Sequence, residues 1–225
     1  MTEGFRVKKE WSRIGDDEVR RAKLLPVSNI SDVMSRRFGA PAGLRAMHRG
    51  GKMAGPALTV SVRPGDNLML HKALVMAQPG DVIVVDAGGA LDNAIIGELM
   101  LARGVQAGIA GIVIWGAIRD AGSIAQQDVP VFASGVSHRG PYKDGPGEIG
   151  FPIAVGNMLV NPGDLIVGDE DGILAIPREQ ASVILTRAEG KHHSEEQQLQ
   201  TTLQGKYDAT WIDDALKELG CEFTS

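Results

Sequence analysis

An arginine and an aspartate stand next to each other at Arg119 and Asp120, shortly after an apolar run that starts at Gly111. The run predicts a buried strand that ends in a glycine turn at Gly116, and ligands of open α/β sheets bind beyond the carboxyl ends of strands. A guanidinium can hold an anion with two parallel hydrogen bonds. A carboxylate can hold Mg²⁺, which keeps several waters and takes only one or two protein carboxylates. The pair could therefore clamp an anionic substrate beside a metal; a solvated turn or an aspartate helix cap is the alternative interpretation.

A second apolar run, Val82–Val85, ends in the polar turn Asp86–Gly89, and Gly97 and Glu98 follow along the chain. If the two runs are neighbouring strands, their polar ends overhang the same edge of the sheet. A helix that opens near Gly97 would present free backbone N–H groups and the positive end of its dipole there, which suits a carboxylate or a phosphate. Taken alone, Glu98 is an acidic residue in the first turn of a helix. The convergence with the arginine–aspartate pair indicates a candidate site.

The elements that must position these residues are predicted from apolar periodicity and turn residues. Helices are expected at 11–25, 71–77, 95–103, 121–127, 177–204 and 212–219. One more short helix is expected to begin with a cap at Ser31 and Asp32 and to end at residue 37. Strands are expected at 57–62, 82–85, 111–115, 129–133, 151–155, 158–160, 165–167 and 173–176, with a long loop at 135–150. This order favours an α/β fold, a layered α/β sandwich with mixed sheets. We expect one domain over residues 1–225, with an N-terminal helix and a C-terminal helical extension.

Composition narrows the class of protein. A chain of 225 residues can bury a hydrophobic core that is stable without disulfides or structural metals. A net charge of −5 and the lack of a long basic run disfavour nucleic-acid binding, and 4% aromatic residues disfavour a base-stacking platform. The single cysteine, Cys221, excludes an internal disulfide. The sequence shows no signal peptide and no bilayer-spanning run, so we expect a soluble cytoplasmic protein with neither a nucleic-acid nor a membrane partner.

The same residues resemble a known family signature. Gly97-Glu98-Leu99, Arg103-Gly104 and the segment Gly116–Asp120 are similar to the RraA-like family, and the resemblance extends over roughly residues 28–177. Further matches lie at Ser31-Asp32, 55–60, 79–82, 162–164 and 169–172. The family includes metal-dependent 4-hydroxy-4-methyl-2-oxoglutarate (HMG) and 4-carboxy-4-hydroxy-2-oxoadipate (CHA) aldolases and the regulator of ribonuclease activity. The resemblance implies an α/β sandwich that forms a homotrimer or homohexamer, with sites at subunit boundaries.

The resemblance also implies roles for single residues. Asp120 corresponds to the direct metal ligand, and Arg119 to the residue that binds pyruvate and stabilises its enolate. The backbone amides of Gly97, Glu98, Leu99 and Met100 correspond to the loop that receives the substrate carboxylate. Glu98 also occupies an acidic position that, with water, would move protons. Asp32, and more weakly Glu195, match acidic residues that a neighbouring subunit supplies. The implied cofactor is a divalent metal, Mg²⁺ foremost, with Mn²⁺ and Co²⁺ as alternatives.

The implied activity is that of a carbon–carbon lyase. It would cleave a 4-hydroxy-2-oxo acid of the HMG or CHA type to pyruvate and a second oxo acid, with oxaloacetate decarboxylation as a side activity. The alternative is a non-catalytic RraA-type regulator that binds another protein, because ribonuclease regulators share much of the same turn. One departure is Trp115, where many relatives carry aspartate; its indole could narrow the pocket or pack at a subunit contact.

Three other polar segments carry weaker signals. His192 and His193 lie on a polar helix, where a solvated face is the simpler interpretation. His71 is expected to cap or pack a helix. The segment 138–143 is expected to be a mobile surface loop, with contact to substrate or to a partner subunit as the alternative.

Overall fold

The computed structural model describes residues 4–224. Its helices are α1 (Asp16–Lys23), α2 (Val27–Val33), α3 (Leu68–Met76), α4 (Glu98–Gln106), α5 (Ala121–Ile124), α6 (Ala181–Leu203, after a 3₁₀ turn at Arg178–Gln180) and α7 (Thr210–Glu218). Its strands are β1 (Phe5–Val7), β2 (Arg45–Ala46), β3 (Met53–Val62), β4 (Val82–Asp86), β5 (Ala94–Ile96), β6 (Gly111–Ile118), β7 (Val131–Val136), β8 (Gly147–Ile149), β9 (Ile153–Val155), β10 (Met158–Val160), β11 (Leu165–Asp169) and β12 (Gly172–Ile176).

The central part of the sheet is parallel. Strands β3, β4, β6 and β7 lie side by side in that order and run in the same direction. Antiparallel partners flank them: β8 and β11 pair with β3, and β2 pairs with β7. Strands β4 and β6 are therefore direct neighbours, as the site hypothesis required, and the mixed sheet is confirmed.

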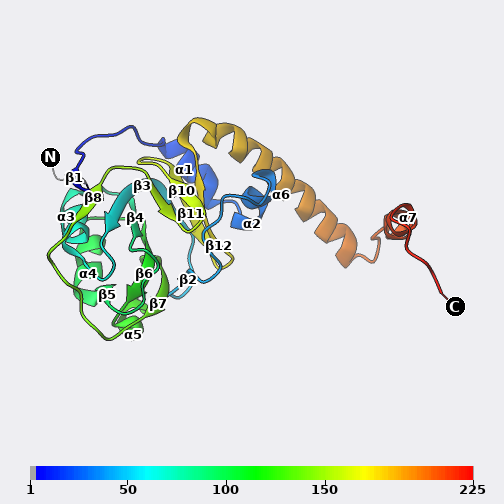
Figure 1. Ribbon diagram of the computed structural model, residues 1–225. Coiled ribbons are helices and arrows are strands. Elements are labelled where there is room, and N and C mark those ends of the chain that lie inside the picture. The colour runs from blue at the N-terminus through cyan, green and yellow to red at the C-terminus, as the bar shows by residue number, and fades with distance from the viewer. Residues whose placement is uncertain (1–3, 225) are drawn as a thin grey trace. The chain divides into compact units, whose positions relative to one another are not determined.

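Strand alternation sorts the core into layers, because successive side chains point to opposite faces of a sheet. One face packs against α3 and α4 through Leu58, Val60, Ile83, Val85, Ile112 and Ile114. The other face packs against β9 to β12 through Ala57, Val82, Val84 and Val113. The outer face of β11 and β12, with Leu165, Val167, Leu174 and Ile176, packs against α1, α2 and the start of α6. The result is a layered α/β sandwich, as predicted, and helices cover both of its outer faces (Figure 1).

The chain divides into two compact units, one up to Ala188 and one from Glu189 onward. Helix α6 begins in the first unit, where Ala181, Ile184, Leu185 and Ala188 are buried. In the second unit, helix α7 carries no buried residue, and Trp211 and Ile212 are exposed. No helix within residues 4–224 is long and apolar enough to cross a membrane.

Several local expectations were wrong. Strand β6 continues through Gly116, so the glycine turn expected there does not exist; a Cβ at Gly116 would lie 3.0 Å from the Cβ of Ala87, which is the close packing of a strand interior. Ser31 and Asp32 lie near the end of α2 rather than at its start, because the helix begins after Pro26. The helix expected from residue 95 is a short strand, β5, followed by α4.

Candidate active site

Asp120 leaves the end of β6 in a backbone conformation that few side chains adopt. Its φ of 57° and ψ of 36° place it in the left-handed region, which aspartate tolerates better than most residues. It directly precedes α5 but makes no side-chain cap for that helix. Its Oδ2 instead accepts the backbone N–H of Glu98 at 3.0 Å, at the start of α4. The turn therefore carries the carboxylate away from its own helix and across to a second one.

Gly97 makes this crossing possible. It is the residue before α4, and its extended φ of −144° is open to any residue. A Cβ at this position would nevertheless collide with Asp120 Oδ2 and lie 3.0 Å from Arg119 Cγ. The backbone N–H of Arg119 donates to Ile96 O at 2.9 Å, which fixes the two chain segments against each other. Glycine is thus required by close approach, and the positive end of the α4 dipole faces the carboxylate.

Arg119 and Asp120 present a cation and an anion together. Arg119 Nε lies 3.8 Å from Asp120 Oδ2, and the two side chains are 44% and 43% exposed. Such an exposed ion pair contributes little to stability. The backbone hydrogen bonds, rather than the ion pair, hold the two groups in place, so both remain available to a ligand.

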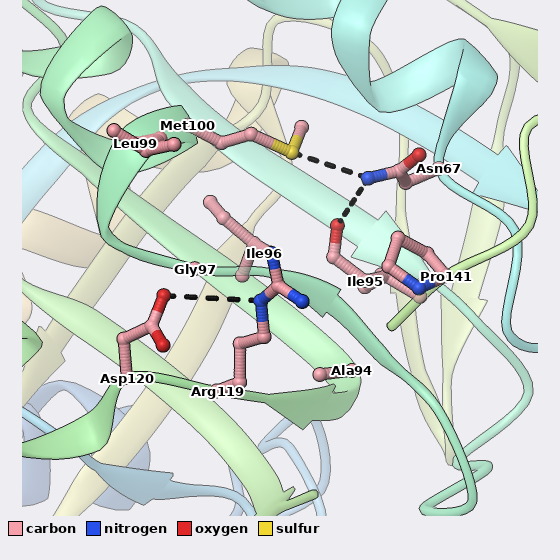
Figure 2. Close-up of a pocket in the computed structure, with 10 residues that line it drawn as sticks. All are labelled: Asn67, Ala94, Ile95, Ile96, Gly97, Leu99, Met100, Arg119, Asp120 and Pro141. Atoms are coloured by element: carbon pink, nitrogen blue, oxygen red, sulfur yellow. Dashed lines mark hydrogen bonds and ion pairs between the residues drawn. The ribbon is translucent and has the colours of Figure 1, made fainter. Parts of the chain in front are cut away.

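The pair forms one side of a small pocket that is partly open to solvent (Figure 2). The opposite side is built by Asn67, at the start of α3, and by Pro141. Asn67 is 2% exposed; its Nδ2 donates to Ile95 O at 3.0 Å and lies 3.2 Å from Met100 Sδ. The remaining lining residues are Ala94, Ile95, Ile96, Gly97, Leu99 and Met100. The pocket is thus charged on one side and largely apolar on the others.

The structure brings most of the predicted site residues together. Gly97, Leu99, Met100, Arg119 and Asp120 all line the pocket. The exposed side chain of Glu98 is not part of the lining, and its backbone N–H donates to Asp120. The amide of Glu98, which was expected to receive a substrate carboxylate, is therefore already bound to a carboxylate of the chain itself.

Two further acidic residues of the predicted site are on other elements. Asp32 is on α2, which packs on β11 and β12, and its Oδ1 accepts from Arg36 Nε at 2.7 Å. Glu195 belongs to the second compact unit, where its Oε1 lies 2.6 Å from Lys191 Nζ. Within a single chain, Asp32 does not line the pocket. Over residues 4–224 no group of three or more histidine, cysteine, aspartate or glutamate side chains is arranged to hold a metal ion.

Trp115 does not line the pocket. It packs with the core cluster on the opposite face of the sheet, which includes Val84 and Val113. A Cβ on Gly89 would lie 3.0 Å from its indole Nε1, and Gly89 has a φ of +69° that favours glycine. Within the chain, the indole therefore packs under the turn after β4 and leaves the pocket unchanged.

Sequence reasoning missed Asn67 and misjudged the segment 138–143. Pro141 of that segment lines the pocket, and Asn93 Nδ2 donates to Gly140 O at 2.6 Å. Backbone bonds from Ala94 to Arg139 O, at 2.9 Å, and from Asn67 to Tyr142 O, at 3.0 Å, add further ties. The segment 138–143 is therefore held beside the pocket by hydrogen bonds and is not a free loop. An asparagine directly before an apolar helix, after a Pro-Gly-Asp turn, indicates a helix cap and does not by itself point to a pocket.

His71 lies one helical turn beyond Asn67 on α3. Its Nδ1 lies 3.2 Å from Arg103 Nη1 on α4. Burial, followed by the positive charges of Arg103 and Lys143, lowers the pKa of His71. The expectation that His71 packs against a helix is met, and its neighbours are cations.

Comparisons with known proteins indicate the family and the fold. The family model described as RraA-like, Aldolase/RraA, matches residues 27–175. A Halalkalibacterium halodurans protein named "Putative 4-hydroxy-4-methyl-2-oxoglutarate aldolase" is 38% identical over 180 residues, which cover 80% of this chain and 86% of that protein. The crystal structure of Streptomyces coelicolor RraAS2, described as an unusual member of the RNase ES inhibitor RraA family, is 29% identical with a TM-score of 0.76, covering 83% of this chain and 98% of that one. An uncharacterized Pseudomonas syringae protein, 22% identical, shares the fold with a TM-score of 0.78 over 88% of this chain and 97% of its own.

Proposed function

The chain belongs to the RraA-like family, and on that premise we propose that it is a divalent-metal-dependent lyase. It would cleave a 4-hydroxy-2-oxo acid of the HMG or CHA type to pyruvate and a second oxo acid. One observation carries the proposal: Arg119 and Asp120 meet at the N-terminus of α4, on the wall of an open pocket. The 38% identical relative named as an aldolase supports the same reaction class.

The single carboxylate of Asp120 suits a hard cation that keeps most of its water ligands better than a cation that is coordinated fully by protein side chains. Asp120 is 43% exposed, and its Oδ2 already accepts a backbone N–H. Within residues 4–224 no further histidine, cysteine or carboxylate completes a cluster around it. Mg²⁺ fits such a site, because it is usually held by one or two carboxylates and keeps several waters, and Mn²⁺ and Co²⁺ are alternatives. When bound, the cation would polarise the 2-oxo group as a Lewis acid.

Arg119 supplies the protein's own electrostatic contribution. In the cleavage, the C4 hydroxyl loses its proton, the C3–C4 bond breaks, and its electron pair moves toward the C2 oxygen to form the enolate of pyruvate. The guanidinium beside the pocket would stabilise that developing negative charge, which is usually the largest catalytic effect in such sites. Protonation of C3 then completes pyruvate. Glu98, exposed next to Asp120, is proposed to exchange protons through water.

The proposal extends to assembly. We propose a homotrimer or homohexamer in which Asp32 and Glu195 of one subunit approach the pocket of the next. In the single chain, Asp32 is not part of the pocket lining. Sedimentation equilibrium should give three or six times the mass of 23.9 kDa for one chain. A monomer at assay concentration would contradict the proposed assembly while leaving the reaction to be tested separately.

The decisive experiment follows pyruvate. Purified protein is incubated with Mg²⁺ or Mn²⁺ and either HMG or oxaloacetate, and pyruvate is measured by a coupled assay. We expect pyruvate release that stops when EDTA removes the metal and returns when Mg²⁺ is added in excess.

The competing proposal is a protein-binding regulator. The 29% identical RraAS2 structure favours it, because that protein is described as a member of an RNase inhibitor family. No pyruvate from any 4-hydroxy-2-oxo acid, together with retention of a ribonuclease partner in a pull-down, would support the regulator and contradict the lyase.

A further inference from the structure

Three cationic or cation-contacting side chains converge next to the pocket. His71 on α3 contacts Arg103 on α4 at 3.2 Å, and the positive charge of Lys143 also acts on His71. The N-terminal end of α3 contacts α4 at two successive points. Asn67 contacts Met100 in the pocket, and His71 contacts Arg103 one helical turn further along. One helical turn spans about 5.4 Å. The cationic cluster therefore begins one turn away from the pocket lining.

These cations lack the acidic partners that their neighbours have. Arg63, in the same part of the molecule, lies 3.4 Å from Asp66 and 3.7 Å from Asp144. Over residues 4–224, no carboxylate forms an ion pair with Arg103 or with Lys143. Both side chains are exposed, so a ligand can reach them. An unneutralised pair of cations beside a small pocket is suited to an anion.

The histidine adds a polar contact rather than a third charge. Burial and the two neighbouring cations lower the pKa of His71, which favours the neutral ring. A neutral imidazole can accept the Arg103 N–H at Nδ1 and donate from Nε2. It can therefore orient the guanidinium and still offer a hydrogen-bond donor to an anion.

We propose that His71, Arg103 and Lys143 form a subsite for the second carboxylate of a dicarboxylic 2-oxo acid whose 2-oxo end lies at Arg119. Arg119, Asn67 and Met100 line the pocket, and the contact between His71 and Arg103 lies one helical turn beyond the contact between Asn67 and Met100, so a guanidinium lies on each side of Asn67. The inference rests on the proposed function for the placement of the 2-oxo end. The test below measures binding as well as turnover, so the two proposals can fail separately.

The first measurement is binding in the presence of Mg²⁺. Calorimetric titration compares 2-oxoglutarate with 2-oxopentanoate, which has the same chain length but only one carboxylate. We expect wild-type protein to bind the dicarboxylate more tightly. Arg103→Gln should reduce that preference by roughly tenfold, the size of one charge-assisted contact at an exposed site, while the affinity for 2-oxopentanoate stays unchanged. Lys143→Gln should act in the same direction.

Lys72→Gln is the matched control. Lys72 is exposed and follows His71 on α3, so this variant removes the same charge outside the subsite. An equal loss in Lys72→Gln and Arg103→Gln would indicate a general charge effect and overturn the subsite. A wild-type protein with no preference for the dicarboxylate, or one that binds neither probe, would overturn it as well, whereas pyruvate release alone decides the lyase.

Turnover separates the two proposals further. With 4-hydroxy-2-oxo acids as substrates, Arg103→Gln should lower kcat/KM for a dicarboxylic acid and leave a monocarboxylic one unchanged. A dicarboxylate preference in binding, without pyruvate release from any substrate, would support the subsite and reject the lyase. Pyruvate release with an unchanged substrate preference in Arg103→Gln would support the lyase and reject the subsite.

Discussion

Two neighbouring strands of the sheet, β4 and β6, each lead to an aspartate: Asp86 is the last residue of β4, and Asp120 follows the end of β6 at Ile118. Asp86, at the end of β4, accepts the N–H of Gly88 at 2.9 Å within its own turn. Asp120, after β6, accepts the N–H of Glu98 at 3.0 Å from another element. Burial raises the pKa of Asp86, whereas the side chain of Asp120 is 43% exposed on the wall of the pocket.

The difference shows what makes a strand end a site. Both turns lie at the carboxyl edge of parallel strands, where ligands are expected. The β4 turn folds back on the sheet, because the N–H groups of Ala87 and Gly89 both donate to Trp115 O at 3.1 Å. The β6 turn instead reaches the start of α4 and leaves space beside it. An aspartate at a strand end is thus a candidate ligand only where a second element meets it and a cavity remains.

The largest expected effect comes from removing one charge at each turn. Asp120→Asn keeps an oxygen that can accept the Glu98 N–H and suits the left-handed backbone, but it loses the carboxylate. We expect pyruvate release to fall at least about 1,000-fold, because metal-assisted stabilisation of charge is lost. Asp86→Asn should leave turnover unchanged. Steady-state rates at saturating Mg²⁺ measure both.

Circular dichroism of both variants controls for folding. Wild-type turnover in a folded Asp120→Asn protein would remove Asp120 as the metal ligand. A large loss in Asp86→Asn would show that the β4 turn also takes part in the reaction, and the contrast between the two strand ends would disappear.

Arg119→Lys should have the next largest effect. Lysine keeps the charge but not the planar fork of donors that suits a carboxylate or an enolate oxygen. We expect kcat/KM for pyruvate release to fall roughly 100-fold, as for the loss of one preorganised donor to developing charge. The thermal midpoint should change little, because the ion pair with Asp120 is exposed. Unchanged kcat/KM in this variant would mean that Arg119 does not bind the reacting oxygen.

A pair of glycine substitutions separates activity from stability. In Gly97→Ala the new Cβ meets Asp120 Oδ2, so the carboxylate must shift, and we expect about a tenfold loss of turnover. In Gly89→Ala the φ of +69° costs roughly 1–2 kcal/mol of stability, and turnover should be retained. Urea denaturation and rate assays on both variants measure the two effects. The opposite pattern would mean that the β4 turn, not the β6 turn, shapes the active centre.

The layers of the fold were predictable because they depend on local patterns. Short β-branched runs such as Val82–Val85 and the alternation of helices and strands before residue 135 indicate buried strands with helices on their faces. The boundaries around the site were not predictable. Gly116 was interpreted as a turn because glycine commonly ends strands, but here it lies inside β6 and allows close contact with Ala87. Only the tertiary neighbour distinguishes these two uses of glycine.

The candidate site was predictable where its residues are adjacent in sequence, as at Gly97–Met100 and Arg119–Asp120. It was not predictable where distant segments meet. Asn67 and Pro141 line the pocket because backbone hydrogen bonds hold the segment 138–143 against the start of α3, and no local sequence pattern encodes that pairing. The roles of Asp32 and Glu195 stay a prediction, since in a single chain Asp32 is not part of the pocket lining and Glu195 belongs to the second compact unit.

The smallest expected effect concerns the pH dependence of stability at the β4 turn. Burial raises the pKa of Asp86, so the folded protein keeps this proton to a higher pH than the unfolded chain, whose aspartates titrate near about 3.9. As pH rises through this window, the unfolded state releases the proton first, and wild-type stability falls.

The amide introduced by Asp86→Asn does not titrate, and its oxygen can still accept the Gly88 N–H. The free energy of unfolding of the variant relative to wild type should therefore rise between about pH 3 and pH 7, measured by urea denaturation at each pH, because the other titrating groups cancel in the difference. A difference that is constant or falls across this range would mean that the Gly88 hydrogen bond outweighs burial, and Asp86 would then resemble an ordinary paired carboxylate.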